Sequence, residues 1–257
     1  MTELFCKGCG AQIQHEDDTL PGFITKEFLA DKDVADVVCQ RCFRIKHYSE
    51  TFPYQVSNMD FLSVIDKIKK ENALIVKIVD IFDFSGSFVP AIKDLTGNED
   101  VIIVGNKMDL LPKNVKPTRI LDWLQTMLRS QGFSVLDSVL LSAKYGDNFD
   151  ELMEKIRKHK GVRNVYIVGS SNVGKSKIVN QILKRYLGAA SDIVTESLSP
   201  QTTIGMIGFQ LTDGTYIYDT PGVINRHQYV HYLTRSSYKM TVPTREIKPM
   251  VYQLNEG

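Results

Sequence analysis

The sequence predicts an α/β fold in which a parallel sheet carries helices on both faces and follows a small cysteine-rich module. Short apolar runs rich in β-branched residues alternate with stretches of helical periodicity, which is typical of parallel sheets. A glycine-rich loop joins one of these runs to a helical stretch within residues 165–187. All four cysteines lie within the first 42 of the 257 residues, so a separate module is expected there.

The alternation of strands and helices sets the boundaries that we expect. Residues 1–55 form the cysteine module, 56–225 the α/β domain and 226–257 a connector. Apolar runs predict strands at 74–79, 101–104, 135–141, 165–168, 206–211 and 215–219. Helical spacing predicts helices at 58–71, 88–95, 117–131, 148–158 and 175–187. Asp213-Gly214 lies between the last two strands and is typical of a hairpin turn.

Composition favours a cytoplasmic protein that has no membrane partner. No apolar run approaches the roughly 20 residues of a membrane span. The N-terminus MTELFCKGCG has neither the apolar core of a signal peptide nor the character of an organelle transit peptide. The net charge of +1 neither supports nor excludes a nucleic-acid partner.

Residues 169–176 have the sequence GSSNVGKS, which predicts a phosphate-binding loop. Its backbone N–H groups are expected to surround the β-phosphate, Lys175 to neutralise the β- and γ-phosphates, and Ser176 to hold Mg²⁺. The alternative is a plain glycine-rich turn, and the apolar strand and helix on either side argue against it. The expected nucleotide contacts are Gly169, Ser170, Ser171, Asn172, Val173, Gly174, Lys175, Ser176 and Lys177.

Two further stretches are expected to supply the remaining Mg²⁺ ligands and a contact to the γ-phosphate. The sequence DTPG at 219–222 follows a strand, so the Asp219 carboxylate can hold Mg²⁺ through water and the Gly222 N–H can approach the γ-phosphate. In residues 200–203, Thr203 is the first choice for a further Mg²⁺ ligand and Thr202 the second. A solvated Ser/Thr loop is the alternative for this last stretch.

Residues at two further strand ends predict which base the bound nucleotide carries. Asn106-Lys107-Met108-Asp109 follows a buried strand, and a carboxylate there can accept two hydrogen bonds from the N1–H and N2–H₂ edge of guanine. Adenine offers no such pair of donors and would leave the desolvated carboxylate unpaired. Ser142-Ala143-Lys144 ends another strand and is expected to present a backbone N–H to guanine O6.

The two Cys-x-x-Cys pairs, Cys6/Cys9 and Cys39/Cys42, have the spacing of a four-thiolate zinc site. Four unrelated thiols are the alternative, and a redox pair would need a thioredoxin-like βαβ context that the sequence lacks. A closed shell of four thiolates predicts a structural rather than a catalytic zinc ion. A module of about 50 residues with little core would depend on that ion.

Together these residues resemble the motifs of the GTPase superfamily, usually called G1 to G5. Here they occur in the order G4 (106–109), G5 (142–144), G1 (169–176), G2 (around 203) and G3 (219–222). The chain is therefore similar to circularly permuted GTPases. The cysteine pairs, the stretch VDIFDFSGS at 79–87 and the tail REIKPMVYQL resemble the YqeH-type branch, a group of bacterial ribosome-assembly GTPases.

This resemblance implies GTP hydrolysis and a switch role in assembly of the small ribosomal subunit. The implied partners are a guanine nucleotide and ribosomal RNA or a ribosomal subunit precursor. In the family a further C-terminal domain follows, so we expect the natural chain to continue past residue 257. The alternative is a GTPase that serves a metabolic or membrane-associated process, although no second catalytic group of residues is visible.

The expected catalytic residues are Lys175, Asn172 and Thr203. The position after the G3 glycine, often a glutamine in related GTPases, is Val223 here, so slow intrinsic turnover is expected. Asn172 lies where some related GTPases help to bind K⁺, which makes K⁺ an expected cofactor beside GTP or GDP, Mg²⁺ and Zn²⁺. The segment 223–257 is expected to be a nucleotide-sensitive tether, with residues 223–235 ordered in the GTP state.

Overall fold

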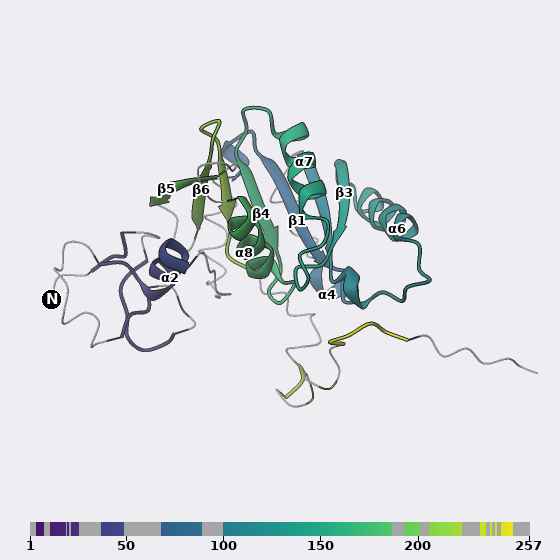
Figure 1. The fold of residues 1–257 in the computed structure, drawn as a ribbon, viewed down its shortest axis with the longest axis horizontal. Coiled ribbons are helices and arrows are strands. Elements are labelled where there is room, and N and C mark those ends of the chain that lie inside the picture. Colours follow the sequence, from purple (N-terminus) through teal and green to yellow (C-terminus); the bar gives the residue numbers. More distant parts are fainter. Residues whose placement is uncertain are drawn as a thin grey trace, which may run out of the picture.

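The computed structural model describes residues 4–7, 11–18, 20, 22–25, 37–48, 68–88, 100–186, 193–200, 206–222, 232–234, 237, 240 and 243–248. Within these ranges, seven strands form one sheet in the order β3-β2-β1-β4-β7-β6-β5 (Figure 1). The strands are β1 (Leu74–Asp80), β2 (Asp100–Asn106), β3 (Val135–Leu141), β4 (Val165–Gly169), β5 (Ile193–Pro200), β6 (Ile207–Leu211) and β7 (Tyr216–Asp219). β3, β2, β1, β4 and β7 run parallel to one another, and β6 pairs antiparallel with both β7 and β5.

The register of the parallel strands brings their polar ends to one edge of the sheet. Asp80 at the end of β1 lies opposite Asn106 at the end of β2. On the other side of β1, Ile78 lies opposite Gly169, the last residue of β4. β4 in turn pairs with β7, which ends at Asp219. This edge, at the carboxyl ends of the strands, is where open α/β sheets bind ligands.

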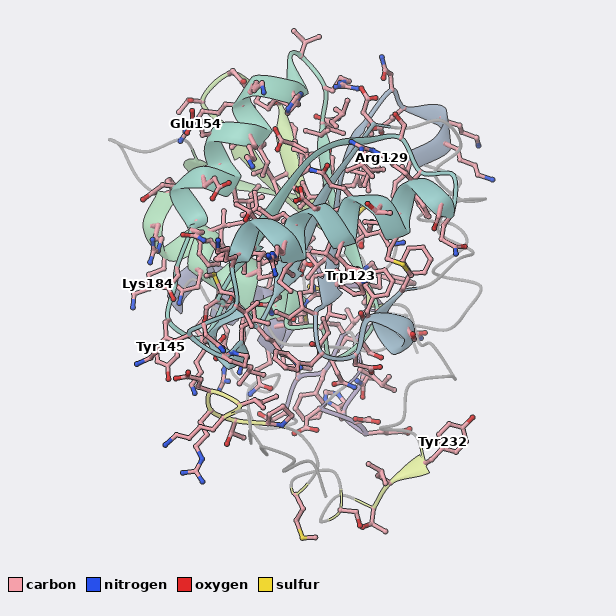
Figure 2. All side chains as sticks on the ribbon, turned by 90° about the vertical axis from the view of Figure 1, so that its right-hand side faces the viewer. Trp123, Arg129, Tyr145, Glu154, Lys184 and Tyr232 are labelled. Atoms are coloured by element: carbon pink, nitrogen blue, oxygen red, sulfur yellow. The ribbon has the colours of Figure 1, made fainter. Side chains whose placement is uncertain are left out.

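Helices cover both faces of the sheet, which gives three layers. The helices are α2 (Gln40–Tyr48), α4 (Phe84–Ser87), α6 (Pro117–Ser130), α7 (Phe149–Lys160) and α8 (Lys175–Tyr186), with a short 3-10 helix, η2 (Met108–Leu110). α7 and α8 bury residues such as Phe149 and Ile178 in one cluster with Leu74 and Val76 of β1. α6 buries Leu124 and Leu128 in a second cluster on the opposite face, and Figure 2 views the molecule from the side of this helix.

The hairpin between β6 and β7 is fixed by its glycine and by a lysine of α7. Gly214 has φ of +83°, a conformation that glycine adopts without strain. Lys160 forms an ion pair with Asp213 in this turn and donates to Thr215 Oγ1 at 3.0 Å. Partial burial opposes ionisation of Asp213, but the hydrogen bonds from Lys160 and Thr215 outweigh it and lower its pKa to about 2.

The cysteine module packs against the sheet rather than standing apart from it. Cys6, Ala11, Cys39 and Cys42 belong to the same buried cluster as Phe209 of β6. α2 begins directly after Cys39 and lies near the β5–β6 end of the sheet (Figure 1). Within the module, Phe5 pairs with Gln12 and Gln14 pairs with Phe23 through isolated bridges.

The predicted α/β class is confirmed, and the predicted strands and hairpin agree with the structure to within a residue or two. The helices expected at 117–131, 148–158 and 175–187 are α6, α7 and α8. Of the helix expected at 58–71, residues 68–70 are helical and residue 71 forms a bend, while 58–67, like 89–95, lie outside the described residues. The sequence patterns do not predict α2, α4 or β5. No helix in the described part of the chain is long and apolar enough to cross a membrane.

Candidate nucleotide site and cysteine metal centre

The phosphate loop lies between β4 and α8, as the sequence predicts. Its backbone turns through two residues with positive φ, Asn172 at 65° and Gly174 at 90°. A Cβ on Gly174 would lie 2.4 Å from Asn106 Nδ2, so only glycine fits at this position. α8 begins at Lys175, and its first backbone N–H groups point toward the loop, which is a favourable arrangement for binding an anion.

Asn106 ties three of the predicted motifs together. Its Nδ2 donates to the Val173 carbonyl of the phosphate loop at 2.7 Å. Its Oδ1 accepts a hydrogen bond from the Ala143 N–H at 3.1 Å. Asn106 is a predicted nucleotide contact, and in this structure its side chain serves as a brace between the phosphate loop and the base-recognition loops.

Asp109, the predicted guanine reader, is held by a neighbouring motif. The Ser142 hydroxyl donates to Asp109 Oδ1 at 2.7 Å, and Ser142 is fully buried. Among the described residues, no hydrogen bond is made to Asp109 Oδ2. A half-buried carboxylate oriented in this way can accept the paired donors of a guanine edge.

The stretch 80–87 supports the site in a way that sequence reasoning did not identify. Asp80 forms an ion pair with Lys107 and accepts a hydrogen bond from the Phe82 N–H at 3.0 Å. Ser87 Oγ accepts from the Asp80 N–H at 2.9 Å, and the Ser87 carbonyl accepts from Ser170 Oγ of the phosphate loop at 3.3 Å. The unusual pattern VDIFDFSGS was the available signal, but no role for Asp80 or Ser87 followed from it.

Asp219 lies at the centre of the predicted magnesium side. Its Oδ1 forms an ion pair with Lys175 of the phosphate loop, and both side chains are buried. Burial lowers the pKa of Lys175, and the charge of Asp219 opposes this effect. A Cβ on Gly222 would meet Ser171 Cα at 3.4 Å, which places Gly222 against the phosphate loop.

The donors in this region fit a magnesium ion held between protein and phosphates. Ser176 supplies a hydroxyl at the start of α8, and Asp219 supplies a carboxylate that pairs with the preceding residue, Lys175. Mg²⁺ prefers such oxygen ligands and usually keeps several waters. Thr202, Thr203 and Val223 lie outside the described residues, so the third predicted ligand stays a prediction.

Residues 243–248 of the C-terminal segment contact the base-recognition loops. The Ile247 N–H donates to the Leu110 carbonyl at 3.0 Å. Lys144 Nζ, a predicted nucleotide contact, donates to the Thr244 carbonyl at 2.7 Å. The Lys113 N–H donates to Glu246 Oε1 at 3.1 Å. The sequence predicted a nucleotide-sensitive tether over 223–257 and gave no indication of this contact with the base-recognition loops.

Three of the four predicted zinc ligands converge. The sulfur atoms of Cys6, Cys39 and Cys42 all lie within 4.8 Å of one another, and all three residues are buried. The Cys39 N–H donates to Cys6 Sγ at 3.1 Å, an interaction that favours a thiolate. Tetrahedral Zn–S bonds of about 2.3 Å place sulfurs about 4 Å apart, so the arrangement fits. Cys9 lies outside the described residues.

Comparison with known proteins decides the family. A family model described as RsgA GTPase matches residues 92–228, slightly more than half of the chain. The chain belongs to the RsgA GTPase family. The matched region runs from the G4 motif through the phosphate loop to DTPG, so the permuted motif order is a property of the RsgA family.

Individual relatives agree with membership in the RsgA GTPase family. The chain is 40% identical over 256 residues to YqeH of Bacillus subtilis, covering 100% of this chain and 69% of that protein. NO-associated protein 1, chloroplastic/mitochondrial, of Arabidopsis thaliana is 35% identical over 246 residues, with 87% of this chain and 44% of that protein covered. The Small ribosomal subunit biogenesis GTPase RsgA of Haemophilus influenzae is 31% identical over 123 residues, 48% of this chain and 33% of that protein.

These matches confirm the resemblance to circularly permuted GTPases and to YqeH. Membership in the RsgA GTPase family implies hydrolysis of GTP to GDP and phosphate, with GTP, GDP and Mg²⁺ as ligands. The chain spans about two thirds of YqeH and less than half of the Arabidopsis protein. The three converging cysteines can hold a metal ion.

Proposed function

We propose that this protein is a GTP-dependent switch that acts in assembly of the small ribosomal subunit. The observation that carries the proposal is the convergence of the loops at 106–109, 142–144, 169–176 and 219–222 at one sheet edge. Asn106 joins the first three loops, and the ion pair between Lys175 and Asp219 joins the fourth. Support for the ribosomal role comes from the Haemophilus influenzae relative, which is named for small ribosomal subunit biogenesis. The proposed partners are ribosomal RNA or a subunit precursor, in the cytoplasm.

In this proposal each motif holds one part of the nucleotide. Asp109, oriented by Ser142, accepts the guanine N1–H and N2–H₂ donors. Lys175 leaves its ion pair with Asp219 to neutralise the phosphates, and the backbone N–H groups of 170–176 surround the β-phosphate. When bound, Mg²⁺ withdraws charge from the β- and γ-phosphates, and Ser176, Asp219 and Thr203 are the residues that would hold it.

Hydrolysis in this site is proposed to be slow. A valine at position 223 cannot orient the attacking water by a hydrogen bond. Asn172 is exposed at the rim of the phosphate loop and has positive φ, a geometry that leaves its side-chain oxygen available to a monovalent cation. We propose K⁺ there as a source of positive charge for the transferring phosphoryl group.

The C-terminal segment is proposed to carry the switch outward. Residues 244–247 hydrogen-bond to Leu110, Lys113 and Lys144, which flank the predicted guanine site. A nucleotide that fixes these loops therefore changes the free energy of holding the segment, which is the requirement for coupling. We propose that the cysteine module, closed by a structural zinc ion, serves as a docking element.

The second candidate is a GTPase in a metabolic or membrane-associated process unrelated to ribosomes. It is favoured by the plant relative, which is named for nitric oxide association and for chloroplasts or mitochondria. The two candidates differ in whether GTP controls binding to a ribosomal subunit.

Co-sedimentation with ribosomal subunits separates the candidates. The full-length natural protein is mixed with purified small subunits in GDP, in GTP or in a non-hydrolysable GTP analogue. The proposal expects association with small subunits in one nucleotide state and about 5- to 150-fold weaker association in the other, since coupling energies of 1–3 kcal/mol are typical. Equal sedimentation in all three conditions would contradict a GTP-controlled ribosomal role.

The matched control is Asp109→Asn, which replaces the acceptor of the guanine edge. This variant should associate in response to a xanthosine triphosphate analogue and no longer to the GTP analogue. If the GTP analogue still controls association of Asp109→Asn with the small subunit, the control of binding lies outside this site.

A further inference from the structure

Arg41 belongs to the cysteine module in sequence but reaches the nucleotide site in the fold. It lies in the stretch Cys39-Gln40-Arg41-Cys42, within the first turn of α2. Two of the three converging thiols therefore flank it, and a metal ion held by them would fix the backbone from which its side chain extends. Only 8% of its surface is exposed.

The Arg41 guanidinium contacts the carboxylate at the end of β7. Arg41 Nη2 lies 3.3 Å from Asp219 Oδ2, while Asp219 Oδ1 pairs with Lys175. Asp219 is 1% exposed, so its two oxygens are divided between two buried cations. One oxygen faces the phosphate loop and the other faces the cysteine module.

This division matters for a carboxylate that is expected to hold Mg²⁺. Residues that hydrogen-bond to a metal-binding carboxylate fix its orientation, and their loss typically weakens metal binding about 10- to 100-fold. One carboxylate shared by two cations also leaves an excess of positive charge, which favours a negatively charged Mg²⁺–nucleotide. GTP carries one more negative charge than GDP and gains more from that excess.

We propose that Arg41 is a positioning residue of the nucleotide site that the cysteine module supplies. By holding Asp219 Oδ2 it keeps Oδ1 turned toward the phosphate loop and the Mg²⁺ shell. Metal binding by the cysteines and binding of Mg²⁺–nucleotide therefore strengthen each other by the same factor, as linkage requires. The inference rests on the proposed nucleotide and zinc sites, but it does not depend on the ribosomal role.

A purely structural ion pair makes different predictions. Such a pair would join the module to the domain, and its loss would lower stability without changing how nucleotide binding depends on Mg²⁺. Buried ion pairs are commonly weak sources of stability, so a stability loss alone would not identify the role of Arg41. The test must therefore measure the Mg²⁺ dependence itself.

The first measurement is release of fluorescently labelled GDP and of a labelled non-hydrolysable GTP analogue as free Mg²⁺ is titrated. Arg41→Met should raise the Mg²⁺ concentration at half-maximal retention about tenfold or more and weaken the GTP analogue more than GDP. Arg41→Lys keeps the charge without the planar fork and should recover part of the loss.

The matched control is Arg163→Met, which breaks an ion pair with Asp100 at the opposite edge of the sheet, where N···O is 2.9 Å. It should leave the Mg²⁺ midpoint within about twofold of wild type, since distant sites act independently. An Arg41→Met protein with the Mg²⁺ dependence of wild type would overturn the proposal.

The second measurement is the rate of zinc loss, and its main comparison uses the wild-type protein only. Loss of zinc to a coloured chelator should be several-fold slower when Mg²⁺ and the GTP analogue are bound to wild type. Arg41→Lys should reduce this protection, and Arg163→Met should retain it. Zinc loss at one rate with and without Mg²⁺–nucleotide would refute the coupling, even if Arg41→Met proved unable to fold. Failure to bind guanine nucleotide at all would instead refute the proposed function.

Discussion

The buried side chain of Lys77 makes a prediction that can be tested by measuring the stability of the protein alone. It lies in β1 within the apolar run LIVKIV and has no exposed surface. Its Nζ has no hydrogen-bond partner among the described residues. The ammonium group lies 3.9 Å from the centre of the Phe88 ring and 4.3 Å from that of Phe133. Burial lowers the pKa of Lys77 from 10.5 to about 7.

The cost of this burial follows from the pKa difference. At 1.36 kcal/mol per unit, a fall from 10.5 to about 7 destabilises the folded state by roughly 5 kcal/mol once the lysine is charged. Lys77→Met, which keeps the length and removes the charge, should therefore raise the free energy of unfolding by several kcal/mol, up to about 5, at pH 7.

The pH dependence has a definite sign. Because the folded pKa lies below the unfolded one, the penalty is absent above pH 10.5 and complete below about pH 7. Wild type should therefore become more stable relative to Lys77→Met as the pH rises from 7 to 10. Urea unfolding of both proteins at several pH values in this window measures the difference.

Lys155→Met is the matched control, because this lysine has the opposite environment. Partial burial acts against its charge, but hydrogen bonds with Glu151 and Asp137 prevail and raise its pKa. Its replacement should lower stability rather than raise it, by up to about 1 kcal/mol. A Lys77→Met protein that is less stable than wild type, or a stability difference independent of pH, would refute this account of the buried charge.

Four further predictions concern the site. Ser142→Ala removes the hydrogen bond to Asp109 and should lower GDP affinity about tenfold, as measured by labelled-GDP titration; an unchanged affinity would show that Asp109 needs no support. Freshly purified reduced protein should contain about one zinc ion per chain, and elemental analysis finding none would remove the zinc assignment. GTP hydrolysis should be faster in K⁺ than in Na⁺ at equal ionic strength, and Asn172→Ala should abolish the difference, whereas equal rates in wild type would return Asn172 to a loop-shaping role. Amide exchange at Ile247, whose N–H donates to Leu110, should slow when nucleotide is bound, and identical exchange in both states would separate the tail from the base loops.

The parts of the site that the sequence predicted depend on local pattern and on one rule of topology. Apolar β-branched runs locate β1, β2, β3 and β4, and the carboxyl ends of parallel strands meet at one edge. Asn106, Asp109, Ser142 and Lys175 each lie at or just beyond the boundary of an element with a clear pattern, so their convergence was predictable. The roles of individual residues were harder to predict, because the brace formed by Asn106 depends on the path of the phosphate loop.

The remaining features depend on contacts between distant segments. Arg41 and Asp219 are separated by 178 positions, and no periodicity or motif links them. α2 is mostly polar and starts between two of the converging cysteines, so no apolar periodicity marks where it begins. Lys77 occurs in a run that predicts a buried strand, but which face it occupies depends on Phe88 and Phe133 in other parts of the chain.

Competition between nucleotides tests most directly the claim that this site binds a guanine nucleotide through Asp109. Wild-type protein is loaded with labelled GDP, and unlabelled GTP, GDP, ATP and ADP are titrated against it at fixed Mg²⁺. GTP and GDP should displace the label, and ATP and ADP at about a thousandfold higher concentration should not, because adenine leaves the Asp109 carboxylate unpaired. Displacement by ATP at concentrations similar to those of GTP would contradict the assignment of the base site.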